Sequence, residues 1–405
     1  MLRFTVRALR CVVAVLGALI LFAGDARADL LGDTLKPFAS VMEMYDSNVF
    51  RVKDREQLRQ LVGDDRMGDF ITLASVGTAV HYTLSMQELD LLLRKDFIRY
   101  SHYTGQDTGR DEASGRLSLN VLDSVKIGIE GSYTLAPQPR ADFRGADPNE
   151  VTTSRYGISA GYESTTGIGV EAAFRREEVA YSLAELSANE YTADYYSGTL
   201  SYRISPGAKV YASYQREERD YHEGVPVGAR TLKSDNVGDS FRIGLSKRFT
   251  PRTAVSGHIG YLERRYSPLS SRDYSGLIGK AEITYGLTAK LGLVANWERQ
   301  LVEETYTDRI YSINDLAGVG LVYQISEKLK GTVLERLSWK DFVDVPGSGV
   351  APRSDFIQDL SAGLEWAPCK RLTVNLGYQY STRSSDDDTY DFISHGVTTG
   401  IAYRF

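Results

Sequence analysis

The sequence predicts an all-β protein, a transmembrane antiparallel up-and-down β-barrel of about 18 strands. Segments of about ten residues alternate apolar and polar side chains from the start of the mature chain to Phe405. The connections between them alternate in length, with short turns such as Asp123-Ser124 followed by long polar loops such as 136–152. Short periplasmic turns and long extracellular loops are typical of outer-membrane barrels. The pattern therefore predicts an orientation as well as a fold.

The front of the chain predicts the compartment. Three arginines precede an apolar run over 11–23, and Ala26-Arg27-Ala28 has the small residues of a cleavage site. We expect a signal peptide over 1–28 and a single barrel domain over 29–405, in the outer membrane of a Gram-negative bacterium. A retained N-terminal anchor is the weaker alternative, because a membrane-spanning helix needs about 20 apolar residues.

Charge and composition exclude several function classes. The formal net charge is −6. Loss of 1–28, which contain four Arg and one Asp, makes it −9, so nucleic acid is not an expected partner. Only Cys369 remains in the mature chain, and the five histidines are scattered. We therefore expect no cofactor and no metal site. We also expect no enzymatic activity, because the placement of Ser256 and His258 on one predicted strand face is only a weak sign of catalysis.

The strands can be placed from their period-two pattern and the turn residues between them. Their predicted ranges are 36–45, 70–82, 87–98, 112–122, 125–135, 153–163, 167–176, 191–204, 208–219, 237–249, 253–264, 275–286, 290–303, 314–324, 328–341, 356–366, 371–381 and 394–405. Within 275–286, Lys280 and Glu282 alternate with apolar residues. A lipid-facing Lys at mid-bilayer costs about 2–4 kcal/mol, so both side chains are expected to face the lumen.

The C-terminal segment is expected to close the barrel. Val397, Ile401, Tyr403 and Phe405 lie on one side of an alternating pattern that continues to the last residue. An unpaired strand edge is not tolerated in lipid, so 394–405 is expected to pair with 36–45. Ile401, Tyr403 and Phe405 also resemble the C-terminal signal that the outer-membrane assembly machinery recognises.

The same alternation predicts which side chains line the lumen. Barrels of about 16–18 strands leave an aqueous channel. The predicted pore-lining residues are Glu88, Asp90, Arg94, Arg116, Lys126, Glu130, Glu171, Arg175, Arg242, Lys280, Glu282, Asn296, Glu298 and Gln379. Both signs occur in similar number, whereas a dedicated anion or cation pore would show one dominant sign. This mixture suits a hydrated polar polymer, a general diffusion pore, or a wall whose charges pair and bind nothing.

The first long connection, 46–69, has a possible helical face. Leu58, Leu61 and Val62 would share one face of a helix. This segment could fold into the mouth and constrict it, or lie on the surface.

A motif at the end of the first strand resembles a known family. Residues 45–51, Tyr-Asp-Ser-Asn-Val-Phe-Arg, follow soon after the signal peptide. They resemble the EpsL type of β-barrel protein from exopolysaccharide clusters with exosortase and PEP-CTERM systems, in a wider group labelled "putative β-barrel porin". The motif residues Tyr45, Asp46, Asn48 and Phe50 would lie at the extracellular rim. Alternatively, the motif is a strand-to-loop turn in which Tyr45 and Phe50 anchor at the interface.

The resemblance implies export of an extracellular polysaccharide across the outer membrane. The implied partners are the polymer, outer-membrane lipid and lipopolysaccharide, the assembly machinery and separate periplasmic export proteins. A porin for small hydrophilic solutes is the alternative from another class. A structural or adhesive barrel with a blocked lumen is a third.

Overall fold

The computed structural model describes residues 34–141, 143, 145–227, 230–267, 270–304, 309–344, 349 and 351–405. The predicted signal peptide, 1–28, lies outside the described residues. Across the ranges given above, no helix is both long and apolar enough to cross a membrane.

Eighteen strands form one continuous antiparallel sheet. They are β1 (Leu35–Asp46), β2 (Asp69–Leu84), β3 (Gln87–Tyr100), β4 (Thr108–Leu122), β5 (Val125–Pro137), β6 (Glu150–Glu163), β7 (Ile168–Tyr181), β8 (Tyr191–Ser205), β9 (Ala208–Tyr221), β12 (Asn236–Thr250), β13 (Thr253–Tyr266), β14 (Tyr274–Gly286), β15 (Leu291–Glu303), β16 (Arg309–Ser326), β17 (Leu329–Asp344), β18 (Ser354–Cys369), β19 (Leu372–Ser385) and β20 (Phe392–Arg404). The remaining elements are helix α3 (Arg55–Val62), a small hairpin of β10 (Val225–Val227) and β11 (Arg230–Leu232), and the 3-10 turns η2 (Thr104–Gln106), η3 (Ala184–Asn189), η4 (Ser270–Arg272) and η5 (Asp388–Tyr390).

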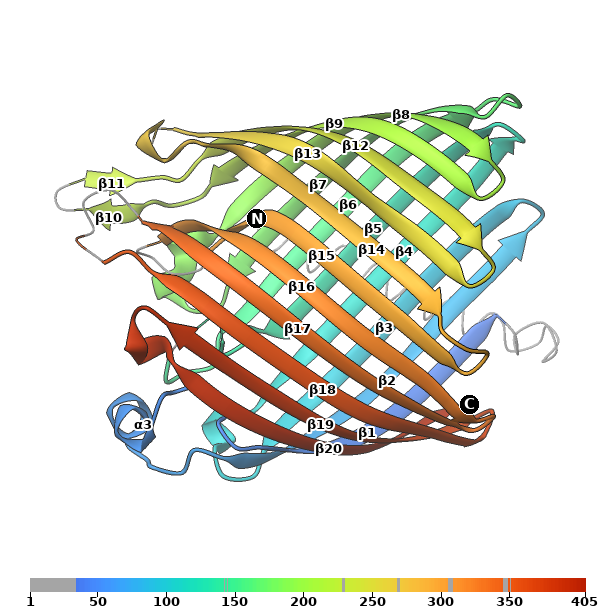
Figure 1. Cartoon of the computed structure of the whole chain (residues 1–405). Helices are drawn as coiled ribbons and strands as arrows, with labels where there is room; N and C mark the ends of the chain where they lie inside the picture. Colours follow the sequence, from blue (N-terminus) through green and yellow to red (C-terminus); the bar gives the residue numbers. More distant parts are fainter. Residues whose placement is uncertain are drawn as a thin grey trace, which may run out of the picture.

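The sheet closes on itself. Every strand pairs with its neighbours in the chain, and the last strand, β20, pairs with the first, β1, from Phe38↔Arg404 to Asp46↔Gly396. The structure therefore confirms the predicted up-and-down barrel and its closure, which leaves no strand edge facing lipid. Figure 1 shows the tilted strands wrapped around a single axis.

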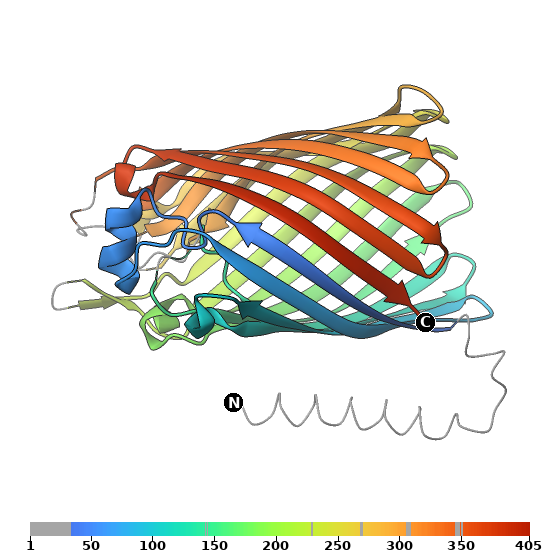
Figure 2. The ribbon, with the colours of Figure 1, turned by 90° about the horizontal axis from the view of Figure 1, so that it is seen from below.

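The connections sort by length as the sequence predicts. Turns of two to four residues join strands at one end of the barrel, and connections of five to 22 residues join them at the other. Figures 1 and 2 place the C-terminus at the turn end and α3 at the loop end. By the outer-membrane rule, the turn end is periplasmic and the loop end extracellular.

Several strands extend further toward the loop end than predicted. β7 continues to Tyr181 rather than 176, β4 begins at Thr108 rather than 112, and β16 begins at Arg309 rather than 314. The predicted loops are longer than the observed ones. The prediction recognises a strand by its apolar outward face, which is a valid criterion only inside the bilayer. Beyond the bilayer that criterion fails for β4 and β7, since outward side chains there, such as Asp111 and Glu178, are charged.

The outer surface shows the boundary directly. Exposed apolar side chains such as Ile158, Val170 and Ile259 form the lipid-facing band. Above it, outward positions carry ion pairs: Lys95–Asp111 at 2.5 Å, Arg176–Asp194 at 2.5 Å, Arg265–Asp239 at 2.9 Å and Arg299–Asp315 at 2.6 Å. Charged side chains on the outer face are tolerated near or above the interface and not at mid-bilayer. These pairs therefore mark where the strands leave the hydrocarbon.

Candidate functional site: the lumen

Strand alternation assigns each side chain to lipid or lumen. The exposed large apolar residues of each strand share one parity, as with Tyr156, Ile158 and Tyr162 on β6, so the other parity faces inward. By this rule and the pairing registers, the structure places all fourteen residues predicted to line the pore on the inner face: Glu88, Asp90, Arg94, Arg116, Lys126, Glu130, Glu171, Arg175, Arg242, Lys280, Glu282, Asn296, Glu298 and Gln379.

Part of this inner face is an ion-paired wall. Arg116 lies 3.0 Å from Glu130, and Lys280 lies 3.4 Å from Glu298. On β3, Arg94 contacts Asp96 at 2.7 Å. The first two pairs follow the strand registers, because directly opposed residues on one face are close enough to interact. Arg94 and Asp96 are neighbours on one face of the same strand.

The family-like motif builds the turn that follows β1. Asp46 is buried, and its carboxylate accepts hydrogen bonds from the backbone of Asn48 at 2.9 Å and from the Ser394 hydroxyl at 2.7 Å. It also pairs with Arg51 at 2.7 Å, and Arg51 has a left-handed backbone with φ 55°. The Asn48 amide bonds Val52 at both its N–H and C=O. The motif residues thus hold a tight turn at the rim, as in the alternative interpretation.

Phe50 does not anchor at the lipid interface, so that part of the alternative interpretation was wrong. Phe50 is 1% exposed and packs among Val52, Leu58, Tyr100 and Tyr103. The long connections that follow β1, β3 and β5 meet around Phe50. The turn residues hold the connection after β1 against the other two loops, so Phe50 faces protein and not lipid. Tyr45, by contrast, is exposed on the outer face and packs on Phe70 with ring centroids 5.1 Å apart.

The segment 47–68 caps the rim. Its helix α3, which begins at the N-cap Asp54 and ends at Gly63, buries Leu58 completely and packs Leu61 and Val62 beside it. Lys53 contacts Asp388 at 2.5 Å in the last loop. Burial raises the pKa of Tyr103 to about 12, so its phenol stays protonated and donates to the Arg66 carbonyl.

Asn48→Ala is expected to loosen this cap. The side chain is 1% exposed and also donates to the Ile393 carbonyl at 3.0 Å, so its loss leaves buried backbone groups without partners, at about 1–3 kcal/mol each. The expected result is faster limited proteolysis within 51–68 on intact cells. Asp54→Ala, at the exposed N-cap of α3, is the matched control and should have a smaller effect. Equal cleavage of the N48A variant and the wild type would refute the role of Asn48.

The loop end of the hairpin β15–β16 is folded into the lumen. β14 and β15 pair only from Gly286↔Gly292 to Gly279↔Arg299, although each continues toward the loop end beside its other neighbour. Beyond that point Leu301, Ile310, Tyr311 and Ile313 pack against Leu262, Tyr266, Tyr274 and Ile278. The last four point inward from β13 and β14. The tip therefore lies on the inner side of these strands.

Polar contacts fix this tip to the wall. Glu303 accepts hydrogen bonds from Arg264, from Tyr266 at 3.3 Å and from Tyr221 at 3.3 Å, and lies 3.5 Å from Arg219. These partners point inward from β9 and β13. The Tyr311 ring stacks on Tyr266 with centroids 5.5 Å apart. The tip therefore narrows the lumen. This constriction is an element that the sequence analysis did not predict.

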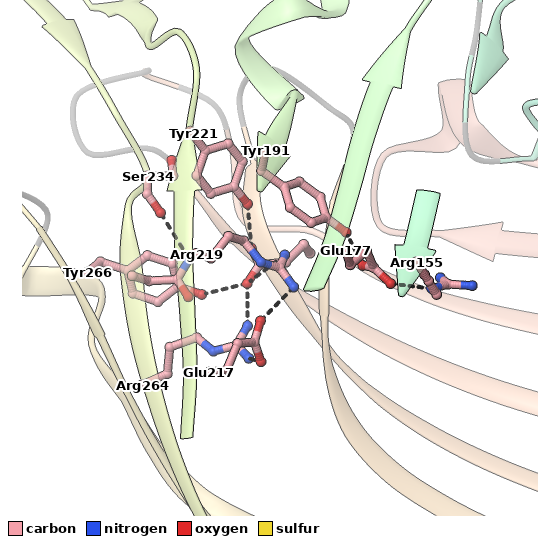
Figure 3. A network of polar contacts seen from close by, with 11 residues as sticks. Arg155, Glu177, Tyr191, Glu217, Arg219, Tyr221, Ser234, Arg264 and Tyr266 are labelled. Atoms are coloured by element: carbon pink, nitrogen blue, oxygen red, sulfur yellow. Dashed lines mark hydrogen bonds and ion pairs between the residues drawn. The ribbon is translucent and has the colours of Figure 1, made fainter. Parts of the chain in front are cut away.

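The wall beside the tip is a continuous network. Glu217 bridges Arg219 at 2.7 Å and Arg264 at 2.6 Å, and the Arg219 guanidinium lies 4.2 Å from the Tyr191 ring. Tyr191 in turn donates to Glu177 at 2.8 Å, which pairs with Arg155. Figure 3 shows these side chains converging across β6 to β9 and β13.

Sequence reasoning missed this constriction. By alternation alone, Leu301 and Ile313 belong to the lipid-facing set of β15 and β16, and the one segment expected to narrow the mouth was 46–69. A usable signal exists in 299–315, where the outward pair Arg299–Asp315 is followed by further apolar residues. Outward apolar residues are not expected on a strand above the hydrocarbon unless the tip of that strand packs on other parts of the protein.

A second buried network lies at the loop end of β18 and β19. The Asp355 carboxylate accepts from Arg353 at 2.8 and 2.5 Å and from Ser385 at 2.6 Å, and lies 3.4 Å from Arg383. The side chains of Asp355, Arg353 and Arg383 are 0%, 1% and 2% exposed. This network stiffens the rim two strands beyond the β15–β16 hairpin.

Toward the turn end the inner wall is hollow. A space of about 740 Å³ is lined by Arg116, Lys126, Arg175, Tyr195 and Gln215, among others. A second space, of about 650 Å³, shares Arg203 and Lys209 with it. Serine, threonine and glycine residues lie between the charged ones on the walls of both spaces, so backbone and hydroxyl groups are accessible to a polar permeant.

The lumen separates its charges by side. Inward positions on β7, β8, β9, β12, β13 and β14 carry eight cations and four acids: Arg175, Arg203, Lys209, Arg219, Arg242, Arg248, Arg264 and Lys280 against Glu171, Glu177, Glu217 and Glu282. The six facing strands, β18, β19, β20, β1, β2 and β3, carry four cations and eight acids: Arg383, Arg404, Lys36 and Arg94 against Asp355, Asp359, Glu365, Asp46, Asp69, Glu88, Asp90 and Asp96. Together the two groups of strands carry equal numbers of cations and acids, but their separation produces an electrostatic field across the lumen.

Comparison with protein families agrees with the closed barrel. A family model described as "Putative beta-barrel porin 2" matches residues 32–405. The chain belongs to this family. A porin family and a closed 18-stranded barrel indicate an outer-membrane location and a transport role. None of the curated proteins matches the sequence.

Three solved structures match the chain at low sequence identity. The outer membrane protein OpdK from Pseudomonas aeruginosa has a TM-score of 0.49 at 10% identity, covering 92% of this chain and 100% of its own. OccAB3 from Acinetobacter baumannii has 0.49 at 8%, covering 92% and 99%. The siderophore receptor PirA from Pseudomonas aeruginosa has 0.42 at 11%, covering 92% and 80%. Likeness at this level carries no statement about the permeant.

Proposed function

We propose that this barrel is the outer-membrane conduit for export of an extracellular polysaccharide. The proposal starts from the resemblance of residues 45–51 to the EpsL type. The observation that carries it is the lumen: a polar hollow with charged, serine, threonine and glycine residues lies toward the turn end, and the inward-folded β15–β16 tip narrows the lumen at the loop end. Polymer would enter from the periplasm, delivered by separate periplasmic proteins.

The hollow has the chemistry that a sugar chain needs. A pyranose ring presents apolar C–H faces and a rim of hydroxyl groups. The wall of the larger space offers the Tyr195 ring and, beside it, the Ser197 and Thr199 hydroxyls and the Gln215 amide for hydrogen bonds. Many weak contacts of this kind let a polymer bind and still move on, which conduction requires.

A porin for small hydrophilic solutes is the second candidate. The inward-folded β15–β16 tip favours it, because a fixed constriction suits selection of small solutes as well as control of a polymer. That function predicts a steady conductance of the purified barrel in planar bilayers without any other protein.

The location of polysaccharide in a clean deletion strain tests the export function. We expect polymer to disappear from the cell surface and accumulate in the periplasm, and the intact gene to restore it. A gene lacking β20 should not restore export, because the barrel cannot close without that strand. Normal surface polymer in the deletion strain would reject export and leave the porin function.

A further inference from the structure

We infer that the basic wall of the lumen binds carboxylate groups of its permeant, at a site centred on Arg175 and Arg242. If the barrel exports a polysaccharide, as proposed above, the polymer is then an acidic one that contains uronic-acid or similarly carboxylated sugars. The inference rests on the proposed function for the polymer and on the structure for the anion site.

Within the ranges that the structure describes, Arg175 forms no ion pair with a carboxylate. Its guanidinium lies 4.2 Å from the centre of the Tyr195 ring, and its Nε is buried without a hydrogen-bond partner among the described residues. The stack holds the guanidinium plane in place on the wall of the larger hollow, which Arg175 and Tyr195 both line. An arginine fixed this way has donors left for a carboxylate.

Arg242 supplies a second such cation on a neighbouring part of the wall. Its side chain lies over Gly260, where an added Cβ would come within 2.7 Å of the Arg242 Cγ. One terminal nitrogen is 3.4 Å from the Gln215 amide oxygen, and Nε lacks a partner within the described part of the chain. Gln215 lines the same hollow as Arg175, so the Arg242 guanidinium lies directly behind a residue on the wall of that space.

Three of the other four arginines of this wall are paired with acids, and the fourth, Arg248, is exposed at the turn end beside the smaller space. Arg219 and Arg264 share Glu217 and Glu303, and Arg203 pairs with Glu163. In contrast, the described ion pairs include no carboxylate contact for Arg175 or Arg242. Arginine matches a carboxylate with two parallel N–H donors.

The charge separation across the lumen reinforces the site. The facing wall of β18–β20 and β1–β3 has twice as many acids as cations, whereas the wall that holds Arg175 and Arg242 has the reverse ratio. A carboxylated chain is therefore drawn to one side of the lumen and repelled from the other. A neutral chain would gain nothing from this arrangement.

Blockade of single-channel current tests the inference. Purified barrel in planar bilayers is exposed to tri-galacturonate or to neutral maltotriose, each at several concentrations. We expect tri-galacturonate to block at a concentration at least several-fold lower than maltotriose, and Arg175→Gln and Arg242→Gln each to remove most of that difference. Arg336→Gln is the matched control, since it removes an inward arginine of β17 that belongs to neither wall.

The outcomes separate the site from the export function. Equal blockade by the two sugars, or an equal loss in R336Q and R175Q, would overturn the carboxylate site whatever the deletion strain shows. Selective blockade that R175Q abolishes supports the site even where the deletion strain keeps its surface polymer; the permeant would then be a small acidic solute. Raised salt should weaken the selective blockade, because the attraction is electrostatic.

Discussion

Replacing residues 302–312 by a short Gly-Ser turn is expected to raise single-channel conductance several-fold. Leu301 and Ile313 are directly paired, so the turn would close the β15–β16 hairpin below the folded tip. The change removes the Glu303 carboxylate and the Tyr311 ring from the lumen. It costs the pairs that Arg309, Tyr311 and Ser312 make with β17, and it keeps the β16–β17 pairing from Ile313↔Asp341 onward. Conductance of the purified protein in planar bilayers measures the effect.

Folding must be checked separately for that variant. Retained resistance to unfolding by heat in detergent would show that the barrel still forms. The milder variant Glu303→Gln should raise anion selectivity, since Arg219 and Arg264 would then share Glu217 as their carboxylate. An unchanged conductance after removal of 302–312 would mean that the tip does not narrow the path of ions.

Asp355→Ala is expected to lower the free energy of unfolding by about 3–5 kcal/mol, because it leaves buried cations without their acid. Arg353 and Arg383 both contact this carboxylate and are themselves buried. Stacking of Arg353 on Phe342, at 4.4 Å, cannot replace the lost charge. Equilibrium unfolding of the barrel in lipid vesicles with guanidinium chloride measures the change.

Asp359→Ala provides the matched control on the same strand and face. Asp359 accepts one hydrogen bond from Ser381 at 2.6 Å, so its loss should cost about 0.5–1.5 kcal/mol. A similar, small cost for both variants would show that the Asp355 network is hydrated and does not hold the rim together.

Sequence reasoning succeeded where one side chain reports one environment. On β14, Leu277 and Ile283 alternate with Lys280 and Glu282, and lipid admits the first pair and excludes the second. That exclusion gave the strand, its faces and the closure by β20. It failed for Phe50, because a loop aromatic suits a lipid interface and a loop core equally well.

The strand ends show the same limit. Arg176 and Asp194 point outward, as lipid-facing residues do, yet they lie on strands that continue above the bilayer. The sequence pattern has no marker for the height of the membrane other than the change from apolar to charged. The predicted strands therefore ended at the membrane surface, whereas hydrogen bonding continues past it.

The amino-acid pattern alone was enough to predict the barrel, the strand number, the alternation of short turns with long loops and the two faces of each strand, since the lipid face tolerates few exceptions. The three-dimensional arrangement was needed to show that the β15–β16 tip enters the lumen and that cations and acids collect on opposite walls. The reason is distance along the chain: Arg242 and Asp90 are on opposing strands, and Glu303 meets Arg219 across several strands. Such relations depend on how the sheet closes and where a hairpin bends.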